Sequence, residues 1–242
     1  MTSLQSLKHI KSLRLSKFRQ KYNQFTIEGL KSIDELIHSD YEIHGIYATK
    51  QHFDHFANMD KVHLLSDKGY ASISQFKTPA GALAVGEIKT LSMDKILDSE
   101  RLSLVLDGIA DPGNLGTLIR TADWFGIKQI IASKTCADFY NHKTLSSTMG
   151  SFTRVHYFEG DLVSILDGKN TYGALLDGEP LGKALIEDPA FLVIGSESHG
   201  ISKEVQAHIK NKVFIPGAGK TESLNASIAG GILMHEFYTK LK

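Results

Sequence analysis

The feature that most constrains the fold is a regular alternation of short apolar runs and helix-like segments across residues 102–242. The apolar runs predict strands at 102–106, 129–132, 153–158, 172–176, 191–194 and 212–215. The helix-like segments fall at 114–125, 162–167, 203–209 and 223–241. Alternation of this kind predicts an α/β fold, with a mostly parallel sheet and helices on both faces. Ligands of such sheets bind at the carboxyl ends of the strands, so the loops that follow the strands are candidate sites.

The first third of the chain has a separate pattern. Helical spacing is present over 4–22 and 28–38, and shorter helix-like segments lie near 50–57 and 67–76. Apolar strands are expected at 43–48, 62–65 and 82–85. The polar run 88–101 is the best linker candidate. We therefore predict two domains, residues 1–90 and 100–242, both of ordinary size.

The cysteine count and the hydropathy pattern exclude several classes of protein. Cys136 is the only cysteine, so an internal disulfide framework and a cysteine-rich metal site are excluded. No apolar run approaches the length needed to cross a bilayer. The basic start of the chain lacks the continuous apolar segment of a secretory signal. These features predict a cytoplasmic protein without a membrane partner.

Charge is unevenly distributed along a chain whose formal net charge is zero. Residues 1–27 hold no Asp or Glu, so the rest of the chain is net acidic. A basic segment on an acidic body favours contact with a polyanion, whereas the simpler interpretation is a solvated helix face. The basic residues of this segment are Lys8, Lys11, Arg14, Lys17, Arg19 and Lys21.

The segment 215–229, IPGAGKTESLNASIA, predicts a ligand-binding junction between the last strand and the last helix. Gly217 and Gly219 permit close approach of the backbone to a ligand. A phosphate-binding P-loop is excluded, because that pattern needs glycine where Phe214 stands. The string SESHG at 196–200 similarly lacks the first glycine of a hydrolase nucleophile elbow, since Ser196 occupies that position.

Two further loops carry polar residues after predicted strands. In the first, Asn114 is a good helix N-cap, and Arg120 is an unusual cation in an apolar helix, although an isolated arginine there could equally be ion-paired. In the second, Glu197 follows Gly195 and could merely cap the next helix. In the segment 215–229 itself, Ser223 could simply be the N-cap of the last helix.

Together and in this order, the three loops resemble the SpoU/TrmH family of RNA ribose 2′-O-methyltransferases, within the SPOUT class. The first family motif is matched by Asn114, Gly116 and Arg120. The second is matched by Gly195, Glu197, Gly200 and Ile201. The third is matched by Ile215, Pro216, Glu222, Ser223, Leu224, Asn225 and Ser227, with Gly217 where the family usually has methionine. The resemblance covers residues 102–242, and the first 90 residues look like the substrate-binding domain often attached to this fold.

This resemblance implies a fold, a cofactor and partners. It implies a deep trefoil knot in the parallel-sheet domain and a small, L30e-like α/β RNA-binding domain before it. It implies S-adenosyl-L-methionine as methyl donor and no metal. The expected partners are RNA, ribosomal or transfer, and a second copy of the chain in a homodimer, with no DNA. The appended domain favours ribosomal RNA.

The resemblance also implies roles for individual residues. Donor contacts map to Gly195, Ile215 and Leu224, with Gly217 and Gly219 making room for the donor. The catalytic group is Arg120, which either removes the ribose proton or binds phosphate and stabilises developing negative charge. Asn114, Glu197, Ser223 and Asn225 would position it and the 2′-hydroxyl. The six basic residues of 1–27 would contact RNA phosphates.

Two other functions stay open at this point. One is a non-catalytic RNA-binding dimer that keeps the fold, which loss of Arg120 or Asn225 would favour, although both are present. The other is a SPOUT enzyme that methylates a base nitrogen. The first and third motifs argue against it, because they belong to the ribose-methylating branch of the resemblance.

Overall fold

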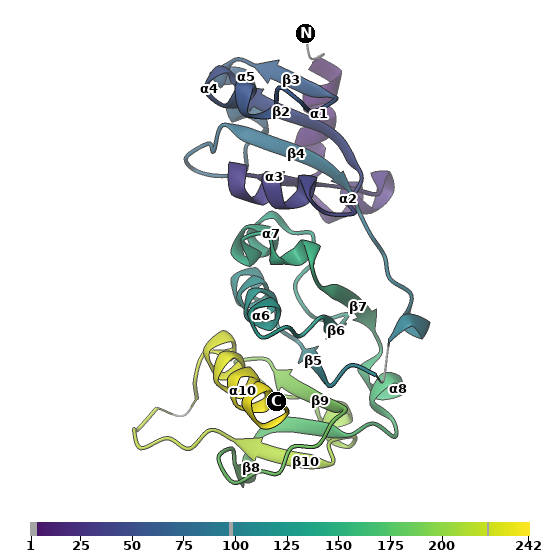
Figure 1. Cartoon of the computed structure of the whole chain (residues 1–242), viewed down its shortest axis with the longest axis vertical. Coiled ribbons are helices and arrows are strands. Elements are labelled where there is room, and N and C mark those ends of the chain that lie inside the picture. The colour runs from purple at the N-terminus through teal and green to yellow at the C-terminus, as the bar shows by residue number, and fades with distance from the viewer. Residues whose placement is uncertain (1–3, 97–98, 222) are drawn as a thin grey trace. The chain divides into compact units, whose positions relative to one another are not determined.

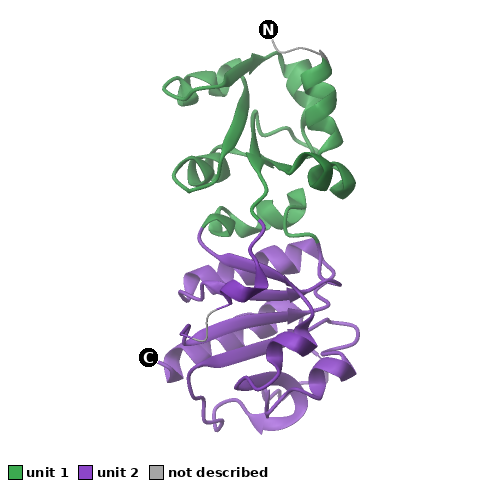
Figure 2. Ribbon diagram, turned by 90° about the vertical axis from the view of Figure 1, so that its right-hand side faces the viewer, with its two compact units in different colours: residues 1–89, 138–153 green, residues 90–137, 154–242 purple. Residues whose placement is uncertain are grey.

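The computed structural model describes residues 4–96, 99–221 and 223–242. The chain forms two compact units, coloured separately in Figure 2. Unit 1 combines residues 1–89 with 138–153, and unit 2 combines residues 90–137 with 154–242. The segment 138–153, which the alternation pattern placed in the second domain, therefore belongs to unit 1.

Unit 1 is built on a four-stranded sheet in the order β1-β4-β2-β3, in which only β2 and β3 are parallel. The strands are β1 (Gln24–Glu28), β2 (Ile43–Thr49), β3 (Val62–Leu65) and β4 (Ala82–Glu87). The helices are α1 (Leu4–Ser12), α2 (Ser16–Tyr22), α3 (Leu30–Ile37), α4 (Lys50–Phe53), α5 (Asp67–Ile73) and α7 (His142–Thr148). Single 3-10 turns follow at Asp54–Phe56 and Ser151–Thr153. An apolar cluster that includes Leu13, Tyr70 and Leu83 packs α1 and α5 on the sheet.

The single helix predicted over 4–22 is wrong, because the chain breaks between α1 and α2. The buried side chain of Arg19 donates from Nη1 to the carbonyl oxygens of Leu13 and Arg14, at 2.9 Å each. These carbonyls are thus satisfied by a side chain instead of by a continuing helix. A side chain that follows the break thus replaces the hydrogen bonds of a continuous helix.

The helix predicted over 28–38 is also wrong at its start. Glu28 ends strand β1, which the spacing analysis missed, and residues 25–28 are buried. Gly29 follows with φ +97°, a backbone angle that no helix can contain, and α3 then begins at Leu30. The alternation of polar and apolar residues in QFTIE is so short that it fits either a strand or the start of a helix.

Unit 2 contains a six-stranded, entirely parallel sheet in the order β10-β8-β9-β5-β6-β7, which confirms the predicted α/β class (Figure 1). The strands are β5 (Leu102–Asp107), β6 (Gln129–Ser133), β7 (His156–Gly160), β8 (Thr171–Pro180), β9 (Ala190–Gly195) and β10 (Asn211–Phe214). The helices are α6 (Pro112–Trp124), α8 (Leu162–Leu166), α9 (Lys203–Gln206) and α10 (Ala226–Lys240), with a 3-10 turn at Met93–Lys95. None of the helices in the described part of the chain is long and apolar enough to cross a membrane.

The core of unit 2 lies on both faces of the central strands. β5 and β9 are mostly apolar and almost continuously buried, as parallel strands covered on both faces are. Val193 faces the cluster formed with α8 and α9, whereas its neighbour Ile194 faces α10. Helices α6 and α10 pack on each other on that second face. The two layers hold the carboxyl ends of β5 and β9 side by side.

Neighbouring glycines on α10 test this packing. A Cβ on Gly230 would lie 2.3 Å from Leu118 Cδ2 and 3.0 Å from Ile194 Cδ1, whereas one on Gly231 would meet only Thr121 Cγ2 at 3.9 Å. We expect Gly230→Ala to lower the free energy of unfolding by about 1–3 kcal/mol through overpacking. Gly231→Ala should raise it by up to about 1 kcal/mol, because alanine is the better helix former. Denaturant titration followed by circular dichroism measures both, and equal stabilities would contradict this packing.

Candidate functional site

The three predicted loops meet in unit 2. Asp107 at the end of β5 is paired with Gly195 at the end of β9, so both strands deliver their following loops to the same edge of the sheet. The β5 loop leads into α6 and the β9 loop contains Glu197. The segment that precedes α10 reaches the same place, as the hydrogen bonds among these loops show. Parallel strands thus supply the convergence that the sequence could only suggest.

A hydrogen-bond network joins the loops through the carboxylate of Glu197. Its Oε1 accepts from the side-chain Nδ2 of Asn114, from Nδ2 of Asn225 at 2.7 Å, and from the backbone nitrogen of Ala226 at 3.4 Å. Asn225 Nδ2 also donates to Asn114 Oδ1 at 3.2 Å. One carboxylate oxygen of the β9 loop therefore gathers donors from the other two segments, and it does so at the surface, where Glu197 and Asn225 are exposed.

The capping residues explain why these side chains are free to form the network. Asp111, and not Asn114 as predicted, is the N-cap of α6, and its Oδ1 accepts from the backbone nitrogen of Asn114 at 2.9 Å. The prediction was wrong because Pro112 is already inside the helix, which moves the cap upstream. The side chain of Asn114 therefore turns to the network instead of to its own backbone.

Asn225 combines a cap with a network contact. It is the N-cap of α10, with Oδ1 accepting from the backbone nitrogens of Ser227 at 3.0 Å and Ile228 at 3.3 Å. Its amide oxygen holds the helix while its amide nitrogen holds Glu197. The helix predicted from 223 thus begins at Ala226, and Ser223 is an exposed residue before it, not the cap. Glu222, which belongs to the third motif, lies outside the described residues.

Arg120 lies on α6 with an exposed side chain. Its guanidinium has no hydrogen bond or ion pair to any residue that the structure describes, so the ion-paired interpretation is not supported. Its neighbours Leu118 and Ile119 are fully buried, which fixes the helix surface from which Arg120 projects. Arg120 is thus available to an external ligand, although no contact joins it to the Glu197 network.

The predicted donor-binding residues border the same edge of the sheet. Gly195 ends β9, where a Cβ would lie 2.1 Å from the carbonyl carbon of Gly200, so only glycine fits this turn. Ile215 directly follows β10 and is half-buried, and Leu224 is 46% exposed. Among the described residues, the backbone groups of 215–221 form no backbone–backbone hydrogen bonds.

The fold itself imposes no requirement for glycine at either position of the glycine pair in this segment. Neither Gly217 nor Gly219 has a positive φ. A Cβ on Gly217 would meet nothing within 4 Å, and one on Gly219 would meet only Thr221 Oγ1 at 3.8 Å. The folded chain itself therefore does not require glycine at either position, and any close approach there would involve a bound molecule.

A cleft of about 380 Å³ opens beside Glu197, at the carboxyl ends of β5, β6 and β9. The sequence analysis missed most of its lining, although each residue lies within a few positions of a strand end, which is the available signal. The lining residues are Asp107, Gly108, Ile109, Ala110, Thr135, Ser196, Glu197, Ser198, His199, Gly200 and Ser202.

Cys136 supports the wall of this cleft. Its Sγ donates to the carbonyl oxygen of Leu106 at 3.4 Å and accepts from the backbone nitrogen of Ile109 at 3.3 Å. Burial raises the pKa of the Cys136 thiol above its usual value, so the reactive thiolate is disfavoured at neutral pH. The residue holds the loop that follows β5.

The basic residues of 1–27 divide into two groups in unit 1. Lys8, Lys11, Lys17 and Lys21 are exposed on α1 and α2. Arg19 is only 4% exposed and forms an ion pair with Asp138 at 2.6 Å, so it is a structural residue and not the phosphate contact that we predicted. Arg14 is half-buried and donates to the carbonyl oxygens of Ser72 and Ser74.

Substitutions at Asn225 distinguish the two roles of its side chain, which caps α10 and donates a hydrogen bond to Glu197. Asn225→Ser keeps a cap, whereas Asn225→Asp keeps the cap but places a second carboxylate against Glu197, and like charges repel. We expect the aspartate variant to be less stable than the serine variant at neutral pH, with the difference shrinking toward about pH 4 as a carboxylate gains a proton. Thermal unfolding at both pH values measures this, and a pH-independent difference would contradict the contact.

Comparisons with known proteins cover both units. The model of the SpoU rRNA Methylase family matches residues 101–235, and the model of the MRM3-like substrate binding domain matches residues 5–84. The 23S rRNA (guanosine(2553)-2′-O)-methyltransferase RlmP of Bacillus subtilis is 30% identical over 240 residues, covering 96% of this chain and 95% of that protein.

Solved structures are similar over the whole chain. A TrmH-family protein from Porphyromonas gingivalis is 34% identical with a TM-score of 0.87, covering 98% of both chains. An AdoMet-bound rRNA methyltransferase from Sinorhizobium meliloti is 27% identical with a TM-score of 0.89, covering 100% of this chain and 98% of that one. With the three motifs joined at one site and a family model matched over more than half of its length, this chain belongs to the SpoU rRNA methylase family.

Proposed function

We propose that this protein transfers a methyl group from S-adenosylmethionine to a ribose 2′-hydroxyl of RNA, with ribosomal RNA as the substrate class. The observation that carries the proposal is the Glu197 network, which unites Asn114 and Asn225 from separate motifs. The full-length similarity to a Bacillus subtilis enzyme named as a 23S rRNA 2′-O-methyltransferase supports ribosomal RNA over transfer RNA. The cytoplasm is the compartment that we expect for this activity.

The residues at the end of the sheet fit the donor. An uncharged adenine is bound by backbone groups and close apolar packing, and the backbone of 215–221, which makes no backbone–backbone hydrogen bond among the described residues, offers such groups. The exposed side chain of Leu224 and the half-buried Ile215 offer the apolar surface. We assign the donor to these residues together with Gly195, Gly217 and Gly219. When bound, S-adenosylmethionine supplies an electrophilic methyl group on a sulfonium.

Arg120 is the residue that we assign to the ribose. A guanidinium keeps its proton in proteins, so it serves better as a phosphate ligand and a source of positive charge than as a base. With no partner among the described residues, it can bind an RNA phosphate beside the target nucleotide. In that position it orients the 2′-hydroxyl and stabilises negative charge that develops on the oxygen. The exposed hydroxyl of Ser223 would contact the same ribose.

The network around Glu197 has a positioning role in this proposal. Its hydrogen bonds fix the start of α10 relative to the first turn of α6, the helix that carries Arg120. Holding the groups on both sides of the reacting atoms in one geometry lowers the entropic part of the barrier.

Unit 1 is the RNA-binding part in this proposal, with an L30e-like arrangement of its mixed sheet and helices. The match to a substrate-binding domain model over residues 5–84 supports it. Lys8, Lys11, Lys17 and Lys21 provide exposed positive charge for phosphates. Arg14 and Arg19 hold α1 and α2 in place for these lysines.

We also propose a homodimer formed through α6 and α10 of unit 2, and a trefoil knot in the chain that ends in α10. Trp124 is 84% exposed and Ile228 56% exposed, and Ile232 and Tyr238 are each 40% exposed. Large apolar side chains gathered on two packed helices are typical of a protein interface. The knot is supported by the connection from the edge strand β10 to α10, a helix packed on the interior strand β9.

Arg120→Ala tests the assigned chemistry. We expect methyl transfer to fall by at least about 100-fold, as for loss of other charge-stabilising donors, while binding of S-adenosylmethionine is unchanged. The control is Arg101→Ala. Arg101 is an exposed arginine of unit 2 that pairs with Asp188, and it directly precedes β5, whereas the candidate site lies at the carboxyl end of that strand.

The assay uses labelled donor and unmodified ribosomal or transfer RNA, followed by mapping of the nuclease-resistant 2′-O-methyl position. Near-normal turnover by Arg120→Ala would refute the role of the arginine. Label on a base, or none on either RNA, would refute the activity itself.

Ile232→Glu tests the dimer. A charge on the exposed face of α10 should convert the protein to a monomer in sedimentation-velocity runs, because a buried unpaired carboxylate is costly. Leu176→Glu, which charges an 81% exposed leucine on β8, should stay dimeric. If the unchanged protein sediments as a monomer at micromolar concentration, the proposed dimer is wrong.

A further inference from the structure

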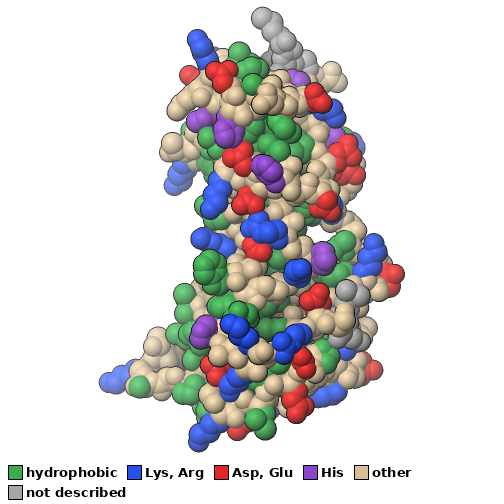
Figure 3. All heavy atoms as spheres, viewed as in Figure 1, with side chains coloured by type: hydrophobic (Ala, Val, Ile, Leu, Met, Phe, Trp, Pro, Cys, Tyr) green, Lys and Arg blue, Asp and Glu red, His purple; other side chains and the backbone are tan. Residues whose placement is uncertain are grey.

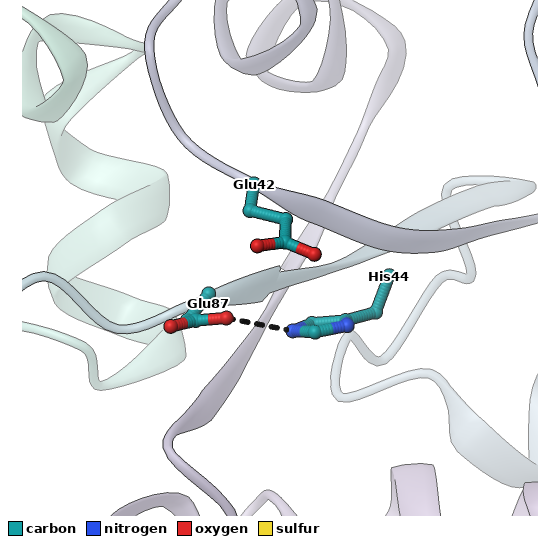
Figure 4. A group of neighbouring side chains, drawn as sticks. All are labelled: Glu42, His44 and Glu87. Carbon is teal, nitrogen blue, oxygen red and sulfur yellow. Dashed lines mark ion pairs between the residues drawn. The ribbon is translucent and has the colours of Figure 1, made fainter.

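Unit 1 contains a side-chain cluster that the proposed methyl transfer does not use. Glu42 and His44 stand at the start of β2, and Glu87 ends the neighbouring antiparallel strand β4. Figure 4 shows the three side chains converging, with the imidazole of His44 directed at Glu87. Each offers one ligand atom, and these atoms all lie within 4.8 Å of one another.

The backbone holds this arrangement in place. The nitrogen of Glu87 donates to the carbonyl oxygen of Glu42 at 2.9 Å, which joins the two strand ends. The ladder pairs Ile43 with Gly86 and Gly45 with Val85, so His44 is the extra residue of a β-bulge. Bulges re-aim side chains beside functional sites, and here the bulged residue is the imidazole.

Among the described residues, no lysine or arginine forms an ion pair with this cluster. His44 Nε2 lies 3.3 Å from Glu87 Oε2, which accounts for one carboxylate. The carboxylate of Glu42 has no hydrogen bond or ion pair to the residues that the structure describes. Lys89, the nearest lysine along the chain, pairs with Asp40 and lies over the Tyr41 ring instead. The cluster therefore holds one carboxylate more than the His44–Glu87 pair uses.

We propose that Glu42, His44 and Glu87 bind one divalent transition-metal ion, represented by Zn²⁺. One imidazole and two carboxylates suit Zn²⁺, whereas Mg²⁺ prefers oxygen ligands alone. Metal–ligand bonds of about 2.1 Å place two ligand atoms at most about 4.2 Å apart, so closure from 4.8 Å needs only small rotations of partly exposed side chains.

Asn23 completes the surroundings of the site. Its Nδ2 donates to Glu87 Oε1 at 3.3 Å, which leaves Oε2 facing His44 and the ion. Hydrogen bonds of this kind orient a ligating carboxylate. The bound ion would fasten the start of β2 to the end of β4, so it stabilises unit 1 and not the methyl-transfer site.

The test is titration of the metal-free, full-length protein with ZnCl₂ by isothermal calorimetry at neutral pH. We expect one saturable site per chain and a rise in melting temperature on addition of Zn²⁺. Glu42→Gln is the decisive variant, because the side chain of Glu42 has no partner among the described residues and the substitution removes only the ligand charge. Affinity should fall at least about tenfold in Asn23→Ala and further in Glu42→Gln and His44→Gln.

A matched control is needed because unit 1 holds most of the chain's 11 histidines, several of them on the face drawn in Figure 3. His55 pairs with Asp34 at 2.8 Å but belongs to no such three-residue group among the described residues, so His55→Gln should keep full affinity. Absence of a saturable site in the unchanged protein would overturn the proposal. Equal affinity in Glu42→Gln, or a loss in His55→Gln, would place the ion elsewhere and would also overturn it.

Discussion

The carboxylate of Glu197 is the interaction on which the functional part of unit 2 depends. It accepts hydrogen bonds from Asn114 in the first turn of α6 and from Asn225 and Ala226 at the start of α10. A charged acceptor makes stronger hydrogen bonds than a neutral one, so one side chain can hold three loops that have little regular structure of their own. Without it, the loop before α10 would be tied to the sheet mainly through the helix that follows.

Dense packing beneath the loops makes this interaction possible. β5 and β9 are adjacent and buried on both faces, so their ends cannot drift apart. Gly195 lets the chain turn against Gly200, and Gly230 lets α10 lie close to Leu118. Small residues at these contacts bring Glu197 to within hydrogen-bond distance of the caps. Arg120 stands outside this network and is exposed, as a residue that binds an external phosphate should be.

The sequence predicted the residue types of the site better than their local geometry. Parallel strand ends and motif spacing were enough to select Asn114, Glu197 and Asn225, all of which the structure brings together. The cap of α6 was misplaced because Asp111 and Asn114 are both good capping residues, and only the start of the helix at Pro112 chooses between them. Arg19 was taken for an RNA contact because a sequence shows its charge but not its burial.

By itself, the sequence determined the class of the fold, the family and the set of polar residues at the site, because apolar periodicity and motif order are properties of neighbouring positions. Only the tertiary structure decided which donors share the Glu197 carboxylate and that the segment 138–153 packs with unit 1. It also decided that Glu42, His44 and Glu87 converge. Each of these depends on strand pairing or on contacts between distant segments. Such contacts are set by the register and burial of the whole unit, which no local pattern records.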